Sequence, residues 1–449
     1  MRRNVRPALG KFGQGLLFAA TVLASVATRA QSPWDYGPPQ YREYVPPQYR
    51  AASANMGWAP APGPTPVPGP TPASTQAPTP APAHYGSPWD PSCGAFPQNP
   101  MPYGGAVAQP GMGCASIAPP MNYACPSPIV WGGRAGALLL FRDDANHEFF
   151  SFDSAIETNQ LLDARDAVDD FGPGVEAQIV RFNICTMRGV EALYWGVFPT
   201  EGSSSVFAGD VTGDLNAILN FDQLDYNGAL ASAFVNDALV QRVRSESDIH
   251  NVEINRLWGF AGGGCSPWTV RGLAGFRFFN FSENFEFAAD TVDTMFTGSA
   301  DELYYTIDVD NYLYGLQLGS YVERASGPWS ATFGAKAGVF ANDASAVSRI
   351  GGAAGTAIVN NGPNIGRPWL VSASKTDVAF IGELRAGGAR QLSLHWRATA
   401  EYRVMAVSGV ALPTNQIFHD LRGLQDVELL ATNGTLLLHG AFFGLERTF

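Results

Sequence analysis

Apolar and polar residues alternate strictly along much of the chain after residue 131. In 392–406 the even positions are apolar or aromatic, whereas the odd positions carry residues such as Arg397 and Arg403. The run 329–341 alternates in the same way, with Lys336 on its polar face. A period of two places successive side chains on opposite faces of a β-strand. Both runs are longer than the roughly 5 or 6 residues usual in soluble strands, and long enough for the about 9–11 of a transmembrane strand.

Weaker versions of the same pattern predict about ten strands, and the connections between them alternate between short and long. Short connections lie near 183, 260–266, 324–327 and 388–390, and long ones separate the strands elsewhere. This layout is typical of a transmembrane β-barrel with tight periplasmic turns and long external loops. The predicted strands are 132–142, 172–182, 185–198, 248–259, 267–281, 303–323, 328–341, 371–387, 391–407 and 434–449.

The sequence therefore predicts an all-β fold, a closed antiparallel transmembrane barrel of about ten strands, with twelve as an alternative. Tryptophans near the short connections fit the aromatic belt expected at a membrane interface. The chain ends in Phe449 on an alternating final strand, which resembles the assembly signal of outer-membrane barrels. A soluble β-sandwich, in which the apolar faces form a core, is the competing fold. The predicted belt comprises Trp131, Trp258, Trp268, Trp329 and Trp396.

Composition agrees with export rather than with a cytoplasmic enzyme. Only 15% of the 449 residues are charged, against roughly 25% in soluble domains, and the net charge of -12 offers no basic field for nucleic acid. Basic residues precede an apolar stretch of about 13 residues, which predicts a signal peptide over 1–30. Of the 33 prolines, 25 lie in 31–128, a low-complexity segment that we expect to be a disordered periplasmic spacer. The barrel is then 129–449.

The sequence shows no recognisable catalytic, cofactor or metal site. The five cysteines lack the paired spacing of a zinc site, and their odd number leaves their pairing open. The histidines are isolated, and neither a G-x-S-x-G elbow nor an H-E-x-x-H pair occurs. We therefore expect no cofactor and no enzymatic activity, with a barrel hydrolase of protease or lipase type as the alternative.

Several local phrases resemble the seventh family of β-barrel porins, which is typical of planctomycetes. They are G-V-E-A-L-Y-W at 189–195, G-L-A-G-F-R-F-F-N-F-S-E-N at 272–284, D-N-Y-L-Y-G-L-Q-L-G at 310–319 and G-A-K-A-G-V-F-A-N at 334–342. The resemblance covers roughly 131–449 and implies an outer-membrane barrel called a porin by analogy. It implies no established substrate, and it leaves the spacer outside.

If the apolar faces meet lipid, the charged faces line the lumen, because a charge facing mid-bilayer costs about 2–4 kcal/mol. These charges could form a selective constriction or an internal salt-bridge network that plugs a narrow barrel. Function is accordingly passive diffusion of small solutes or a structural role in the envelope. A secreted soluble surface or adhesion protein is a further alternative. The predicted lumen residues are Arg271, Arg277, Lys336, Asp377, Glu383, Arg385, His395, Arg397, Glu401 and Arg403.

The expected partners follow from this location. They are outer-membrane lipid, the barrel-assembly machinery through the C-terminal strand, and the cell wall through the spacer.

Overall fold

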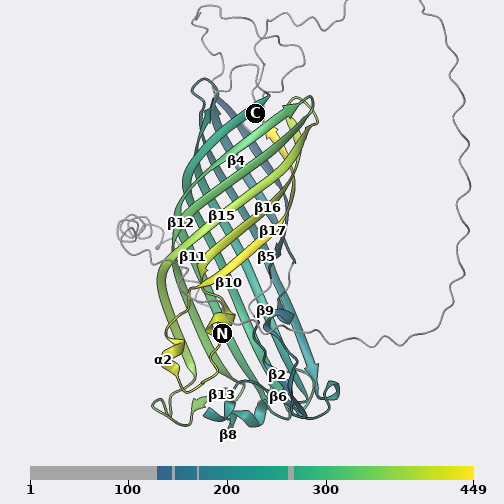
Figure 1. Ribbon diagram of the computed structural model, residues 1–449, viewed down its shortest axis with the longest axis vertical. Helices are drawn as coiled ribbons and strands as arrows, with labels where there is room; N and C mark the ends of the chain where they lie inside the picture. Colours follow the sequence, from purple (N-terminus) through teal and green to yellow (C-terminus); the bar gives the residue numbers. More distant parts are fainter. Residues whose placement is uncertain (1–128, 144–146, 169–170, 261–266) are drawn as a thin grey trace, which may run out of the picture. The chain divides into compact units, whose positions relative to one another are not determined.

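The computed structural model describes residues 129–143, 147–168, 171–260 and 267–449. These residues form a barrel with short turns at one end, the turn side, and long connections at the other, the loop side (Figure 1). The predicted signal peptide and spacer, residues 1–128, lie outside the described residues. Within the described ranges, no helix is long and apolar enough to cross a membrane.

Ten long strands form one antiparallel sheet that closes on itself. Their order is β11-β10-β9-β5-β4-β1-β17-β16-β15-β12, and β12 pairs with β11 to complete the ring. The prediction of a closed ten-stranded barrel is confirmed. A further short strand, β13 (Gly355–Thr356), pairs with the end of β12 outside this ring. The barrel strands are β1 (Ile129–Arg142), β4 (Phe171–Asn183), β5 (Arg188–Phe207), β9 (Val240–Phe260), β10 (Trp268–Asp290), β11 (Glu302–Ser326), β12 (Trp329–Gly352), β15 (Leu370–Gln391), β16 (Trp396–Val410) and β17 (Gly434–Thr448).

One predicted turn is misplaced. The sequence predicted a turn at 388–390, but β15 continues to Gln391 and the turn occupies 392–395. Leu392 and Leu394, which prolong the apolar alternation, are 56% and 82% exposed in this turn. The prediction failed there because turn residues happened to continue the pattern of the following strand.

The main apolar band on the outer surface of the barrel lies in its turn-side half. On β10 the outward-facing Phe278 is followed towards the loop side by the polar Asn284 and Glu286, and the strand runs to Asp290 rather than to the predicted Phe281. Strands β5, β9, β10 and β12 extend beyond the apolar band towards the loop side, which explains why they are longer than predicted, whereas β16 and β17 are slightly shorter than predicted. Outward-facing apolar side chains of the band include Val175, Ile179, Val190, Ile254, Leu316, Leu318, Phe333, Val339, Phe380, Leu384, Val404, Phe443 and Leu445, all substantially exposed.

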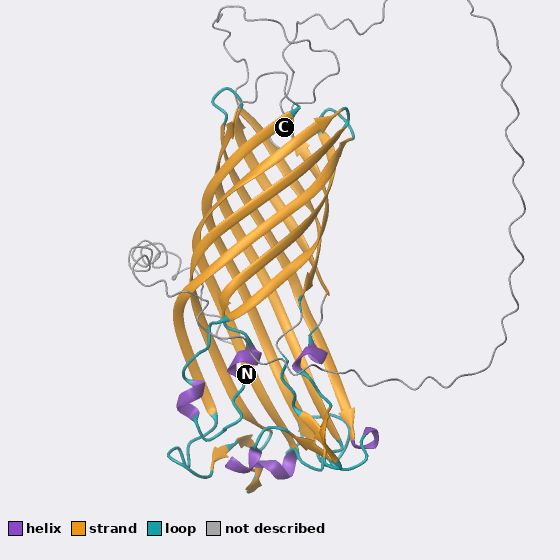
Figure 2. Cartoon of the chain, in the orientation of Figure 1, coloured by secondary structure: helices purple, strands orange, loops and turns teal. Residues whose placement is uncertain are grey.

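The long connections fold into a cap at the loop side. Two small three-stranded sheets, β3-β2-β6 and β14-β7-β8, and several short helical turns lie there (Figure 2). The cap elements are β2 (Ser151–Asp153), β3 (Ile156–Gln160), η1 (Ala164–Ala167), η2 (Ala208–Asp210), β6 (Leu215–Ala217), η3 (Phe221–Gln223), β7 (Leu224–Tyr226), β8 (Ala229–Leu230), η4 (Ala231–Phe234), β14 (Ile358–Val359), η5 (Pro413–Gln416) and α2 (Leu424–Val427).

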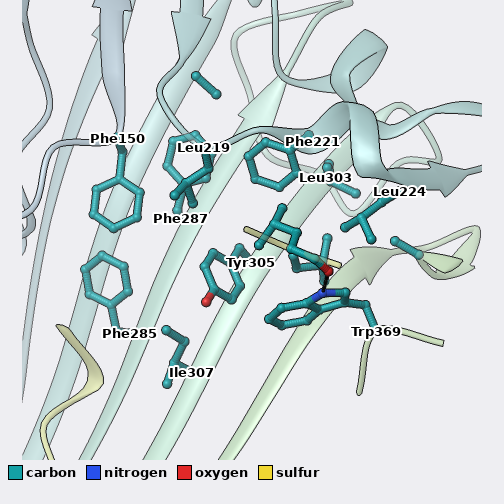
Figure 3. Packing of buried hydrophobic residues seen from close by; sticks show 14 of the residues in the cluster. Phe150, Leu219, Phe221, Leu224, Phe285, Phe287, Leu303, Tyr305, Ile307 and Trp369 are labelled. Carbon is teal, nitrogen blue, oxygen red and sulfur yellow. Dashed lines mark hydrogen bonds between the residues drawn. The ribbon is translucent and has the colours of Figure 1, made fainter. Parts of the chain in front are cut away.

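An apolar core joins this cap to the inner face of the barrel. Phe150 and Phe221 from the connections pack against Phe287 of β10, with ring centroids 5.3 and 6.3 Å apart (Figure 3). The Trp369 indole, which is fully buried, donates a hydrogen bond to the Leu421 carbonyl at 2.7 Å. Burial of this apolar surface holds the connections inside the loop-side mouth.

Candidate functional site in the barrel lumen

Charged side chains from several strands meet across the middle of the lumen. Arg277 on β10 lies 2.8 Å from Glu383 on β15 and 3.7 Å from Glu253 on β9. The Lys336 ammonium on β12 lies 2.7 Å from the Glu253 carboxylate. These four side chains are at most 2% exposed. Each buried charge therefore has an opposite charge at contact distance, as the low dielectric of an interior requires.

Glu176 on β4 forms a second centre in the same layer. Its carboxylate accepts hydrogen bonds from Arg134 and Arg403, and the Arg385 guanidinium lies 3.6 Å away. Arg134 also donates to Glu401 at 2.5 Å. Three arginines thus share one carboxylate that has no exposed side-chain surface.

The charges of this layer, which we call the lumen network, balance. Glu191 joins it through a hydrogen bond of 2.9 Å from the Asn255 amide. The five basic members equal the five acidic members in number, so the formal charge is zero. The members are Arg134, Arg277, Lys336, Arg385 and Arg403 with Glu176, Glu191, Glu253, Glu383 and Glu401.

A smaller group of charges lies nearer the turn side. Arg397 contacts Glu446 at 2.7 Å and Glu323 at 3.0 Å. The Arg271 guanidinium lies over the Phe182 ring, 5.5 Å from its centroid. Between these residues and the lumen network is a cavity of about 30 Å³. That volume accommodates about two water molecules.

On the loop side of the lumen network, large apolar side chains fill the barrel. Trp195, Phe279, Phe281, Phe340 and Phe442 point into this layer, and each is at most 2% exposed. The Trp195 ring also lies 5.1 Å below the Arg403 guanidinium, so the apolar and charged layers are in direct contact.

The chain that follows β16 is tied into the lumen mouth by two asparagines. The Asn311 side chain accepts a hydrogen bond from the Ala411 amide at 2.7 Å and donates one to the Ala411 carbonyl at 2.8 Å. Asn342 donates to the Gly409 carbonyl at 3.0 Å. Gly409 has φ +84°, and the pairing of β16 with β17 shifts register there. This bulge directs the connection 411–433 inwards, over the apolar layer.

The structure brings most of the predicted lumen residues together but leaves two apart. Asp377 lies near the loop end of β15, where it is partly exposed and contacts Lys375 and Thr432, both at 2.7 Å. His395 was predicted to line the lumen, and this is wrong because it lies exposed in the turn 392–395. The residues within the charged layers are Arg271, Arg277, Lys336, Glu383, Arg385, Arg397, Glu401 and Arg403.

Sequence reasoning missed most of the acidic partners. Glu253, for example, alternates with the outward-facing Val252 and Ile254, so the same parity argument would have assigned it to the inner face. Applying that argument to all ten strands would have found the others. The missed charged residues are Arg134, Glu176, Glu191, Glu253, Glu323 and Glu446.

The predicted aromatic belt lies at the turn side, where strands begin or end. Trp131, Trp268, Trp329 and Trp396 are 40–58% exposed, and Trp258 is half-buried. At the C-terminus the Phe449 amide donates to the Trp131 carbonyl at 2.9 Å, so the last residue is joined to the first strand.

Four of the five described histidines contact a carboxylate or a tyrosine hydroxyl, and His395 is exposed in the turn 392–395. His250 contacts both, because its other ring nitrogen lies 3.4 Å from the Asp248 carboxylate. Across the described ranges, no three His, Cys, Asp or Glu side chains are grouped so that they could hold a metal ion. Cys185 is disulfide-bonded. The histidine contacts are His147 with Asp163 at 2.7 Å, His419 with Glu148 at 3.0 Å, His250 with Tyr194 at 3.1 Å and His439 with Tyr402 at 2.7 Å.

The closed sheet and the exposed apolar band define an outer-membrane β-barrel protein. Residues 240–449, from β9 to the C-terminus, match the family described as "Putative beta barrel porin-7 (BBP7)". This match covers just under half of the chain, and it agrees with the resemblance carried by the sequence phrases after residue 240. The phrase at 189–195 lies outside the matched range.

The chain is also similar to solved outer-membrane proteins at low identity. The outer membrane protease OmpT from Escherichia coli is 10% identical, with 72% of this chain and 98% of that chain covered and a TM-score of 0.35. A major outer membrane protein from Thermus thermophilus is 11% identical, with coverages of 72% and 100% and a TM-score of 0.28. The TodX deltaS2S3 mutant, a monoaromatic hydrocarbon channel, is 11% identical, with coverages of 70% and 66% and a TM-score of 0.23. No curated protein matches the chain.

Proposed function

We propose that this protein is a closed, non-conducting barrel with a structural role in the outer membrane. The observation that carries the proposal is the charge-balanced lumen network beneath a layer of buried aromatic rings. An ion crossing the barrel would have to displace ion pairs and then enter an apolar layer, where its hydration is lost. The inward-tied connection 411–433 covers the same route.

Planar-bilayer conductance of the purified full chain tests this proposal. We expect no ion steps from the wild-type barrel. A matched variant changes Arg277, Lys336, Glu253, Glu383 and Trp195 to serine, which removes two basic and two acidic groups and therefore preserves charge balance. We expect ion steps from this variant. Steps from the wild type would instead support the second candidate that the family description favours, passive diffusion of small solutes through a narrow lumen.

We further propose that residues 1–30 are a cleaved signal peptide and that 31–128 form a periplasmic spacer that contacts the cell wall. The basic and apolar sequence of the first segment and the prolines of the second support this assignment. Mass spectrometry of the mature chain should find Gln31 at its N-terminus. Protease added to intact cells should leave the spacer uncut, and cutting there would contradict the periplasmic location.

We also propose that barrel assembly depends on the C-terminal strand. The contact between Phe449 and the first strand, together with the closing pair β1–β17, supports this role. Deletion of Phe449 should lower the amount of heat-modifiable barrel in the outer membrane, whereas deletion of an exposed cap residue such as Gly366 should not. Equal yields would contradict the proposed signal.

The absence of enzymatic activity is part of the same proposal. Purified barrel incubated with peptide and phospholipid substrates should give no hydrolysis above buffer. Hydrolysis that persists after the barrel is repurified would favour the alternative of an outer-membrane hydrolase.

A further inference from the structure

Each of the ten barrel strands contributes one residue to a ring of tryptophan–arginine pairs at the turn side. In every pair the two residues are direct partners across neighbouring strands, with tryptophan on one strand and arginine on the other. The five pairs, which we call the Trp–Arg ring, are Trp131 with Arg181 (β1–β4), Trp258 with Arg188 (β9–β5), Trp268 with Arg324 (β10–β11), Trp329 with Arg390 (β12–β15) and Trp396 with Arg447 (β16–β17).

Four of the pairs share one geometry. The guanidinium lies over the indole, with distances to the ring centroid of 5.9 Å for Arg181, 5.4 Å for Arg324, 5.3 Å for Arg390 and 5.4 Å for Arg447. Such cation–π stacking fixes the arginine against the barrel wall. In the fifth pair Trp258 instead lies over Gly272, where an added Cβ would meet the indole at 2.4 Å.

Among the described residues, the five arginines of the ring have no acidic partner. All five are exposed, and within the described residues none has a carboxylate within 4.0 Å. The outward-facing acids gather beyond the apolar band, towards the loop side, at positions such as Glu201, Glu246, Asp308, Asp310 and Asp343. The turn-side edge of the band therefore carries a ring of five positive charges that no acidic side chain of the described residues neutralises.

We infer that the Trp–Arg ring is a set of five binding sites for the phosphate groups of phospholipids in the leaflet next to the turns. Tryptophan settles at the boundary between headgroups and acyl chains, which is the depth of a phospholipid phosphate. The planar guanidinium binds phosphate in a bidentate manner and stacks on aromatic faces, whereas an ammonium acts only as a point charge. Each pair therefore supplies an apolar surface for the lipid glycerol and acyl region and a donor pair for its phosphate.

A general preference of aromatic residues for interfaces explains the tryptophans but not an arginine opposite each one. A general attraction between basic residues and membranes would be satisfied by arginines anywhere on the rim. The cross-strand register explains both observations, because it places an arginine directly opposite a tryptophan at five positions on the rim. This inference rests on the outer-membrane barrel and not on whether the lumen conducts.

Native mass spectrometry of the full chain, released from mild detergent with added lipid, tests the inference. The probes are phosphatidylglycerol, a diacylglycerol with the same acyl chains but no phosphate, and inorganic phosphate alone. We expect up to five phosphatidylglycerol molecules on the wild-type barrel and none of the diacylglycerol. Inorganic phosphate should not displace the lipid. Displacement, or equal retention of the diacylglycerol, would overturn the inference.

Arginine variants assign the sites. Arg324→Gln should retain one lipid fewer than the wild type, and changing all five arginines to lysine should weaken phosphatidylglycerol binding at least tenfold although the charge is kept. The control is Arg349→Gln, an exposed outward arginine near the loop end of β12, which should leave the number unchanged. Folding of each variant is checked by the heat-modifiable gel shift. A single variant retains four of the five pairs, so we expect it to fold. If folded Arg324→Gln retains as many lipids as Arg349→Gln, the inference is wrong.

Discussion

Changing Glu176 to glutamine should destabilise the barrel strongly, although the side chain keeps its size. The Glu176 carboxylate has no exposed surface and is shared by Arg134, Arg385 and Arg403. The substitution removes one negative charge from a balanced network and leaves one buried positive charge without compensation. Breaking a buried ion pair by removing one partner costs about 3–5 kcal/mol. We therefore expect the free energy of unfolding to fall by about that amount.

The assay is urea unfolding of the barrel in lipid vesicles, followed by tryptophan fluorescence, under conditions in which the unfolding and refolding curves coincide. The control is Glu201→Gln, which makes the same chemical change in an exposed pair. Glu201 lies 2.7 Å from Arg244, and their side chains are 52% and 37% exposed. Such a pair contributes at most about 1 kcal/mol. Equal losses for the two variants would refute the reasoning, because Glu176 would then behave as a solvated charge.

Three further perturbations address the band, the cap and the bulge. Ala337→Arg, in the apolar band, should lower the free energy of unfolding by about 2–4 kcal/mol in urea titrations. Ser345→Arg, outward on the same strand but beyond the band, should lower it by about 0–1 kcal/mol. Similar losses for the two variants would mean that the band is assigned to the wrong part of the strand. Backbone hydrogen bonds, chiefly from Thr212, lower the pKa of Asp153 to about 2. The stabilisation of the cap by the ionised Asp153 carboxylate is therefore present above about pH 4, the ordinary aspartate pKa, and is lost as the pH falls through 2. The protection of the residue 210–214 amides against hydrogen exchange, relative to their intrinsic rates at each pH, should fall over that interval, and unchanged protection would contradict the assigned bonds. Gly409→Ala should cost about 1–3 kcal/mol in the same urea assay, because φ is +84° and the added Cβ would lie 2.4 Å from the Val378 carbonyl oxygen; a neutral effect would mean that the bulge relaxes freely.

The inner and outer faces could be read from the sequence because the strand period is two. Once Arg397 and Arg403 are assigned to the same face of β16, the face of each remaining residue on that strand follows. The opposite, apolar face must then contact lipid or a protein core. The same period predicted about ten strands, and the alternation of short and long connections predicted that they form a closed barrel. It failed at 392–395 because Leu392 and Leu394 continue the alternation through a turn, where no strand constrains the side chains.

The alternation of apolar and polar residues does not predict which side chains contact each other across the lumen. Glu176 meets Arg403, 227 positions further along the chain, because the first and last strands pair. This pairing places β4 and β16 only three strands apart on the curved inner face. The strand register likewise determined that each tryptophan of the belt lies opposite an arginine. This pairing cannot be derived from the sequence of a single strand.

Local sequence thus determined which way each side chain points, since that depends on neighbouring residues of one strand. Tertiary structure alone decided which charges meet, how far the cap enters the mouth and whether the lumen is filled. These depend on strand number, stagger and the path of the connections, which bring together residues that are distant in the chain.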